Sequence, residues 1–211
     1  MSKKHKERRI KFARDTILKD STFLIQLVCS DKKKFNLNGP DGYTHYWHDK
    51  RIKEVALADN TPSIIIMVWA CITNIGKKKI VFVDGNINAQ KYIKILEENL
   101  LEIMDDGDLF FQQDNARPHT AKATKEWFIA NEISVIDWPA YSPDLNIIEN
   151  VWGILTERIY KGRDKFSNLG ELKSQILSEW QKLSIDDISN LYKSLPKKLL
   201  NVIEKKGCFL V

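Results

Sequence analysis

The hydrophobic residues change their spacing near Ala89, and this change limits the fold more than any other feature of the sequence. Before it, short apolar runs of strand length cover 23–29, 63–73 and 79–83. After it, apolar residues recur every three or four positions, as they do on one face of a helix. A group of strands followed by alternating strand and helix signals favours an α/β domain.

Strand and helix signals then alternate along the rest of the chain. The segment 109–111 predicts a strand that runs to Asp114, and 134–136 predicts a short one. Helices are predicted to begin near Pro118, Ser142-Pro143 and Leu169. We therefore expect a mixed sheet flanked by helices, with a helical C-terminal tail. The segment 43–47 is placed as the returning arm of a hairpin with the first strand.

The composition narrows the class of protein. The 211 residues are 43% hydrophobic and suffice for one full domain with extensions. The longest apolar run, 64–72, is too short to cross a membrane. Three widely spaced cysteines (Cys29, Cys71 and Cys208) make a disulfide framework improbable and favour a reducing compartment.

The positive charge is concentrated at the two ends of the chain. The net charge is +5, but residues 1–14 contain seven Lys or Arg and one Glu, and 193–206 contain five Lys and one Glu. The body between these ends is mildly acidic. An anionic partner is expected to contact the ends. For the basic start, three readings stay open: a nuclear localisation patch, an arm that binds the DNA backbone, or merely a solvated start of the chain. The candidate DNA contacts are Lys3, Lys4, Arg8 and Arg9.

Three acidic residues stand at predicted element ends. Asp31 ends the first predicted strand, Asp114 ends the strand at 109–111, and Glu149 lies about one turn into the helix after Ser142-Pro143. Carboxylates are the ligands that Mg²⁺ and Mn²⁺ prefer, and two such ions can support displacement at a phosphorus atom. With 28 acidic residues in the chain, however, three at element ends are also expected by chance.

The residues around these acids carry a family resemblance. The segments QQDNARPHTA (112–121) and WPAYSPDLNIIENVW (138–152) closely resemble the catalytic core of Tc/mariner-superfamily transposases. The 34 residues between Asp114 and Glu149 match the spacing of the Tc-like branch. Upstream, the residues around Asp31 resemble the first-acid motif of the same family, and 85–89 also matches.

The resemblance implies a ribonuclease H-like fold and cut-and-paste DNA transposition. Asp31, Asp114 and Glu149 would be the catalytic acids and the ligands of two Mg²⁺ (or Mn²⁺) ions. The partners implied are transposon ends, TA target sites and a second copy of the chain, in the nucleus and without a membrane. The corresponding division is a basic linker-like arm (1–20), a catalytic domain (21–165) and a helical C-terminal extension (166–211).

Two departures from the family keep other functions open. The residue after the first acid is usually Glu, whereas this chain has Lys32, Lys33 and Lys34. The family's paired helix-turn-helix modules, which precede the segment resembled by 5–20, have no counterpart in this sequence. The alternatives are a catalytically inactive DNA-binding or assembly protein derived from a transposon, and a ribonuclease H-like nuclease with another substrate.

Several other residues are candidates for DNA or metal contact. His119 and Arg117 can contact phosphate, or they can simply occupy a helix start. Trp138 and Tyr141 can stack on a base or pack within a loop. His45 and His48 have a spacing that zinc can use, although a hairpin surface is favoured because no cysteine pair lies nearby.

Overall fold

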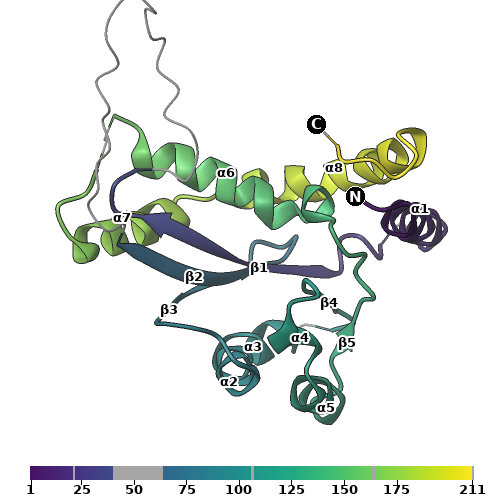
Figure 1. Ribbon diagram of the computed structural model, residues 1–211, viewed down its shortest axis with the longest axis horizontal. Helices are drawn as coiled ribbons and strands as arrows, with labels where there is room; N and C mark the ends of the chain where they lie inside the picture. The colour runs from purple at the N-terminus through teal and green to yellow at the C-terminus, as the bar shows by residue number, and fades with distance from the viewer. Residues whose placement is uncertain (21, 40–63, 106, 163–164, 211) are drawn as a thin grey trace, which may run out of the picture.

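A five-stranded mixed sheet forms the centre of the computed structural model, which describes residues 1–20, 22–39, 64–105, 107–162 and 165–210 (Figure 1). The strand order is β3-β2-β1-β4-β5. The first three strands pair antiparallel, whereas β4 and β5 run parallel to β1. The strands are β1 (Leu27–Asn36), β2 (Ile65–Ile72), β3 (Lys78–Val83), β4 (Phe110–Gln112) and β5 (Ser134–Val135). The predicted mixed sheet flanked by helices is thus confirmed.

Helices cover both faces of this sheet. Figure 1 shows α2 to α5 below the sheet and α6 to α8 above it. The first group is α2 (Ala89–Asn99), α3 (Leu101–Met104), α4 (Arg117–Thr120) and α5 (Lys122–Ala130). The second is α6 (Ile147–Tyr160), α7 (Leu169–Gln181) and α8 (Ile185–Glu204), preceded by the 3-10 turn η1 (Pro143–Leu145). The predicted helical tail is therefore present.

Alternation along β1 divides the core into two layers. Leu27, Cys29 and Phe35 pack with the α6–α8 layer, while Val28 packs with the α2–α5 layer. Successive strand residues point to opposite faces, so Asp31 shares the face of Cys29. The first acid is therefore directed towards the layer that contains α6.

Helix α8 is fixed to the sheet through Tyr192. This side chain is buried, and its hydroxyl lies 2.7 Å from the Leu27 carbonyl oxygen and 2.9 Å from that of Ile72. Its single proton can be donated to only one of the two carbonyls at a time, so the hydroxyl is shared between the start of β1 and the end of β2.

Helix α1 (Lys3–Ile17) occupies most of the predicted arm. It begins at the cap residue Ser2, whose side chain accepts a hydrogen bond from the His5 backbone N–H. It lies beside α8, and both chain ends are found on this side of the molecule (Figure 1). Within the described residues, no helix is long and apolar enough to span a membrane.

Some predicted boundaries are wrong. The apolar run 23–29 is not one strand, because 22–26 form hydrogen-bonded turns and β1 begins at Leu27. Asp31 lies inside β1 rather than at its end, because the strand continues to Asn36. Lys32, Lys33 and Lys34 continue the strand because they pair with Trp69, Val68 and Met67 of β2.

The predicted helices are also divided differently. The helix placed at Ser142-Pro143 starts at Ile147, after η1, with Asn146 as its cap. The helix expected from Pro118 is two short helices that separate at Ala121. The proposed hairpin arm 43–47, with His45 and His48, lies outside the described residues.

Candidate active site

The three predicted acids line one cavity. Asp31 comes from β1, Asp114 from the segment after β4, and Glu149 from the first turn of α6. The cavity has a volume of about 390 Å³, and its wall includes much of the segment between β5 and α6. The fold thus brings together carboxylates that are 35 to 118 positions apart in the sequence.

Asp31 is largely buried beneath α6. The indole Nε1 of Trp152 donates a hydrogen bond to its Oδ2 at 3.3 Å. Burial, followed by the nearby negative charges of Glu149 and Asp114, raises the pKa of Asp31 to about 7. Without a cation, Asp31 is therefore partly protonated near neutral pH.

The pKa of Asp114 is shifted in the opposite direction. Burial acts to raise its pKa, but the hydrogen bond and charge of His119 and the backbone N–H of Ala116 outweigh it and lower the pKa to about 2. Nδ1 of His119 lies 2.5 Å from Oδ1 of Asp114, and the Ala116 N–H donates to the same oxygen at 2.9 Å. Asp114 is therefore held ionised.

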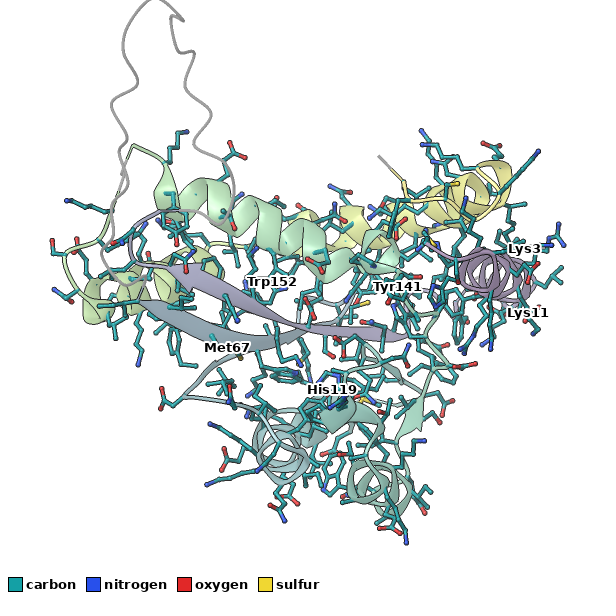
Figure 2. The ribbon with its side chains drawn as sticks, in the orientation of Figure 1. Lys3, Lys11, Met67, His119, Tyr141 and Trp152 are labelled. Carbon is teal, nitrogen blue, oxygen red and sulfur yellow. The ribbon has the colours of Figure 1, made fainter. Side chains whose placement is uncertain are left out.

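His119 is itself fixed from behind. Its ring stacks on Tyr92, with centroids 4.0 Å apart, and the Tyr92 hydroxyl donates to Oε1 of Gln113 at 2.7 Å. Nε2 of Gln113 donates to the His119 carbonyl oxygen at 3.3 Å. Figure 2 shows His119 and Trp152 on opposite sides of the sheet, so the first two acids are supported from different layers.

Glu149 depends on the start of α6. The Asn146 side chain accepts a hydrogen bond from the Ile148 N–H at 3.3 Å and donates to the Ser30 carbonyl oxygen at 3.1 Å. The bond to Ser30 joins the start of α6 to the residue beside Asp31. Burial raises the pKa of Glu149, although the charge of Lys33 acts against this shift.

The chemistry of these residues fits a divalent cation. Three carboxylates, which are hard oxygen donors, line the same cavity. Burial and, in part, neighbouring carboxylates raise the pKa values of Asp31 and Glu149. A bound cation would favour the charged form of both side chains and so offset these shifts. In the part of the chain that the structure describes, no group of three or more His, Cys, Asp or Glu side chains is already arranged to hold a metal ion.

The structure contradicts the prediction that Arg9 contacts DNA. Its side chain is fully buried, and its guanidinium forms an ion pair with Asp144 at 2.5 Å. Lys3 and Lys4 are exposed on α1, and Arg8 pairs with Asp137 at the surface. The buried guanidinium has no donor facing solvent, whereas the two lysines remain accessible.

The other candidates lie at or near the cavity. Tyr141 lines it with 61% of its surface exposed, whereas Trp138 is buried in its wall. Arg117 is exposed at the start of α4. His119 is buried, so it supports Asp114 instead of facing solvent.

Sequence reasoning missed two supporting residues. The sequence pattern places Trp152 on a buried helical face and Asn146 within the family motif, and it indicates no separate role for either residue. Their signal was available, since Asn146, Glu149 and Trp152 follow one another at intervals of three, which places them on one side of a helix start.

Known proteins share both the sequence pattern and the fold. The profile of the DDE superfamily endonucleases matches residues 26–173. The Tc3 transposase of Caenorhabditis elegans is 36% identical over 98% of this chain, which covers 63% of that protein. The Tcb2 transposase of Caenorhabditis briggsae is 31% identical, again over 98% of this chain, which covers 78% of that protein.

Solved structures give the same result for the fold. A Mos1 transposase paired-end complex with the left transposon end superposes with a TM-score of 0.82 and 18% identity, covering all of this chain and 65% of that one. The catalytic domain of the Mos1 mariner transposase superposes with a TM-score of 0.78 and 17% identity, covering all of this chain and 98% of that domain.

Proposed function

Because this chain belongs to the DDE superfamily endonucleases, in their Tc/mariner branch, we propose that it is the catalytic domain of a DNA transposase. The activity proposed is metal-dependent cleavage of DNA at a transposon end and transfer of the freed end to target DNA. The observation that carries the proposal is the convergence of Asp31, Asp114 and Glu149 in one cavity. The chain spans 63% of the Tc3 transposase and 65% of the Mos1 chain, so it corresponds to the catalytic part of longer proteins.

Asp31, Asp114 and Glu149 are the residues proposed to hold Mg²⁺ or Mn²⁺, as two ions per site. Mos1 transposase structures with Mn and with Mg support this choice of metal. When bound, divalent cations would supply Lewis-acid activation of an attacking oxygen and neutralise charge at the phosphate.

The chain's own residues prepare the site for cation and DNA. His119 keeps Asp114 ionised, so one ligand is ready without loss of a proton. Asp31 must be deprotonated before it can bind a cation, and the Trp152 N–H orients the carboxylate for that step. Tyr141 stands at the cavity wall, where its exposed ring can contact a base, and Arg117 is accessible for phosphate.

The DNA partners belong to the same proposal. The Mos1 complex with a transposon end supports binding of transposon ends by this fold, and TA target sites and a homodimer are the partners proposed for strand transfer. Lys3, Lys4 and Arg8 are the proposed backbone contacts outside the cavity. A nuclear location follows if chromosomal DNA is the substrate.

Cleavage of supercoiled or pre-nicked DNA in the presence of Mn²⁺ tests the function. Glu149→Gln is expected to abolish cleavage, because it removes one acidic ligand while nearly keeping the side-chain volume. Glu157→Gln is the matched control, since Glu157 is exposed on the same helix. Equal cleavage by wild type and Glu149→Gln would reject the proposed role of the site.

The second candidate function is a DNA-binding or assembly protein without catalysis. It is favoured by Lys32 and Lys33, whose charges act on Asp114 and Glu149 and compete with a cation. Calorimetric titration with Mn²⁺ separates the two functions. Binding that is lost in Asp114→Asn supports the enzyme, whereas no binding by the wild type supports the inactive protein.

A further inference from the structure

Helix α1 contacts the loop that forms one wall of the acid cavity. This loop, residues 137–144, follows β5 and includes the first two residues of η1, and most of its residues line the cavity. Four α1 side chains touch it along its length: His5 with Tyr141, Arg8 with Asp137, Arg9 with Tyr141 and Asp144, and Phe12 with Trp138. Three of them, at positions 5, 9 and 12, recur at the spacing of one helical face.

Arg9 is the centre of these contacts. Its guanidinium donates to both carboxylate oxygens of Asp144, at 2.7 and 2.5 Å, and to the Tyr141 carbonyl oxygen at 3.0 Å. It also donates to the carbonyl oxygens of Gly207 and Cys208, at 3.1 and 3.3 Å. A buried charge is tolerated only when it is paired and hydrogen-bonded in this way, and the planar fork of arginine suits a carboxylate better than a lysine does.

The C-terminal tail completes the same network. The Leu210 N–H donates to Oδ2 of Asp144 at 2.9 Å. The tail passes so close to α1 that a Cβ added at Gly207 would lie 2.5 Å from the Lys6 carbonyl oxygen. Arg9 and Asp144 therefore hold three separate segments together, namely α1, the loop 137–144 and the tail.

The loop needs this support because part of its backbone is strained. Tyr141 has a φ of +56°, a conformation that residues other than glycine rarely adopt. Such a residue costs about 1–3 kcal/mol and persists only where its surroundings impose it. Arg9 binds the carbonyl of this residue, and the loop leads through η1 into the turn of α6 that carries Glu149.

We propose that Arg9 is a positioning residue of the active cavity: it holds the loop 137–144 so that the Tyr141 ring stays at the cavity wall and Glu149 stays opposite Asp31. The proposal rests on the function proposed above. It assigns to α1 a role in the rate of the reaction, which is not among the three readings that the sequence leaves open for the basic start.

The first readout separates rate from DNA binding. Arg9→Lys keeps the charge but loses the planar guanidinium group that donates to both oxygens of Asp144. We therefore expect the single-turnover cleavage rate at saturating DNA and Mn²⁺ to fall about 10- to 100-fold. The Kd for DNA should stay within about twofold of the wild-type value, because Arg9 is buried. Arg14→Lys is the matched control, since Arg14 is exposed on the same helix.

A double-mutant comparison tests whether Arg9 and Asp144 act as one unit. Asp144→Asn should reduce the rate, and Arg9→Lys with Asp144→Asn should reduce it by less than the product of the two single effects. All rates are measured well below the lowest melting temperature of the set, so that every variant is folded. A folded Arg9→Lys with the wild-type rate, or one whose DNA affinity falls as much as its rate, would overturn the proposal.

Hydrogen exchange gives a readout that does not depend on activity. Arg9→Lys should speed amide exchange across 137–146 while exchange in α7 stays unchanged, because the loop opens locally. Unchanged exchange in the loop overturns the proposal even if the wild type shows no cleavage. Absence of wild-type cleavage together with faster loop exchange instead rejects the proposed function and leaves the positioning contact established.

Discussion

Asp31 and Asp114 share one cavity, yet their pKa values move in opposite directions. Asp31 is buried near other carboxylates, and its pKa rises to about 7. Asp114 is also partly buried, but His119 donates to it, and its pKa falls to about 2. Supporting contacts, rather than residue type, decide which acid is charged before a cation binds.

The raised pKa of Asp31 predicts how stability depends on pH. Between its usual value of 3.8 and about 7, the unfolded chain carries the charge while the folded protein holds the proton. Stability of the metal-free protein therefore falls as pH rises through this window, as far as Asp31 is concerned. Asp31→Asn removes the penalty, so at pH 8 in EDTA we expect it to raise the free energy of unfolding by on the order of 1 kcal/mol or more.

Urea unfolding at pH 5 and pH 8 checks this expectation. The difference between the wild type and Asp31→Asn should be large at pH 8 and small at pH 5. Added Mn²⁺ should stabilise the wild type more than the variant, because only the wild type retains the acid. A lower stability of Asp31→Asn at pH 8 without metal would contradict the assignment.

His119 gives a second prediction for a single residue. His119→Ala removes the bond to Asp114 and the stack on Tyr92, so we expect Mn²⁺ affinity or cleavage to fall about 10- to 100-fold. Thr120→Ala, at an exposed neighbouring position, is the control. Calorimetric titration measures the affinity, and wild-type affinity in a folded His119→Ala would contradict a supporting role.

The sequence predicts the position of some functional residues well and that of others wrongly. Asp114 and Glu149 lie in two long segments of family motif and Asp31 in a separate motif upstream, and the structure gathers the three acids in one cavity. Arg9 was wrongly placed because it sits in a basic run, and charge alone does not reveal burial. Its partner Asp144 lies 135 positions away, so only tertiary packing brings the two together.

The start of α6 gives a prediction for one element. Asn146 caps α6 and bonds to β1 beside Asp31, so Asn146→Ala loses both contacts. Loss of the cap costs about 1 kcal/mol. Because Glu149 lies in the first turn, we expect cleavage to decrease by more than this loss of stability implies.

Asn146→Asp separates the two contacts of this residue. It keeps the acceptor for the Ile148 N–H and loses the donor to the Ser30 carbonyl. Thermal unfolding and single-turnover cleavage are measured for both variants. If Asn146→Asp matches the wild type in cleavage, the bond to β1 has no role in placing Glu149.

Whole elements were predicted in type more reliably than in extent. The buried strand at 63–73 and the helix from Leu169 were identified correctly, because each has a long apolar pattern. The run 23–29 was misassigned, since a short apolar run fits a strand or a packed turn equally well. The lysines at 32–34 were not placed within a strand, because it is pairing with β2, rather than their own propensity, that extends β1 through them.

At the scale of the whole molecule, the two roles proposed for α1 belong to two different sets of its side chains. One face contacts the loop 137–144, and the other carries exposed charges that include Lys3 and Lys4. Removing residues 1–14 would delete both faces together. Substitution of the exposed lysines therefore tests DNA contact more selectively.

A double substitution, Lys3→Gln with Lys4→Gln, is expected to weaken DNA binding without slowing cleavage at saturating DNA. If both lysines contact phosphates, the slope of log affinity against log salt should become flatter by about 1.8. Fluorescence anisotropy over a range of salt concentrations measures this slope. A slope equal to that of the wild type would mean that this face of α1 does not bind the backbone.

The wide sequence separation of the Arg9 contacts determines when during synthesis they can form. Arg9 is synthesised 198 residues before Gly207, whose carbonyl accepts a hydrogen bond from the Arg9 Nε. Contacts of such separation form late, after the sheet and its helices have been made. A chain released before Gly207 would contain every acidic ligand and still lack part of the network that holds the cavity wall. The contacts that hold the cavity wall are therefore complete only after Gly207 has been added.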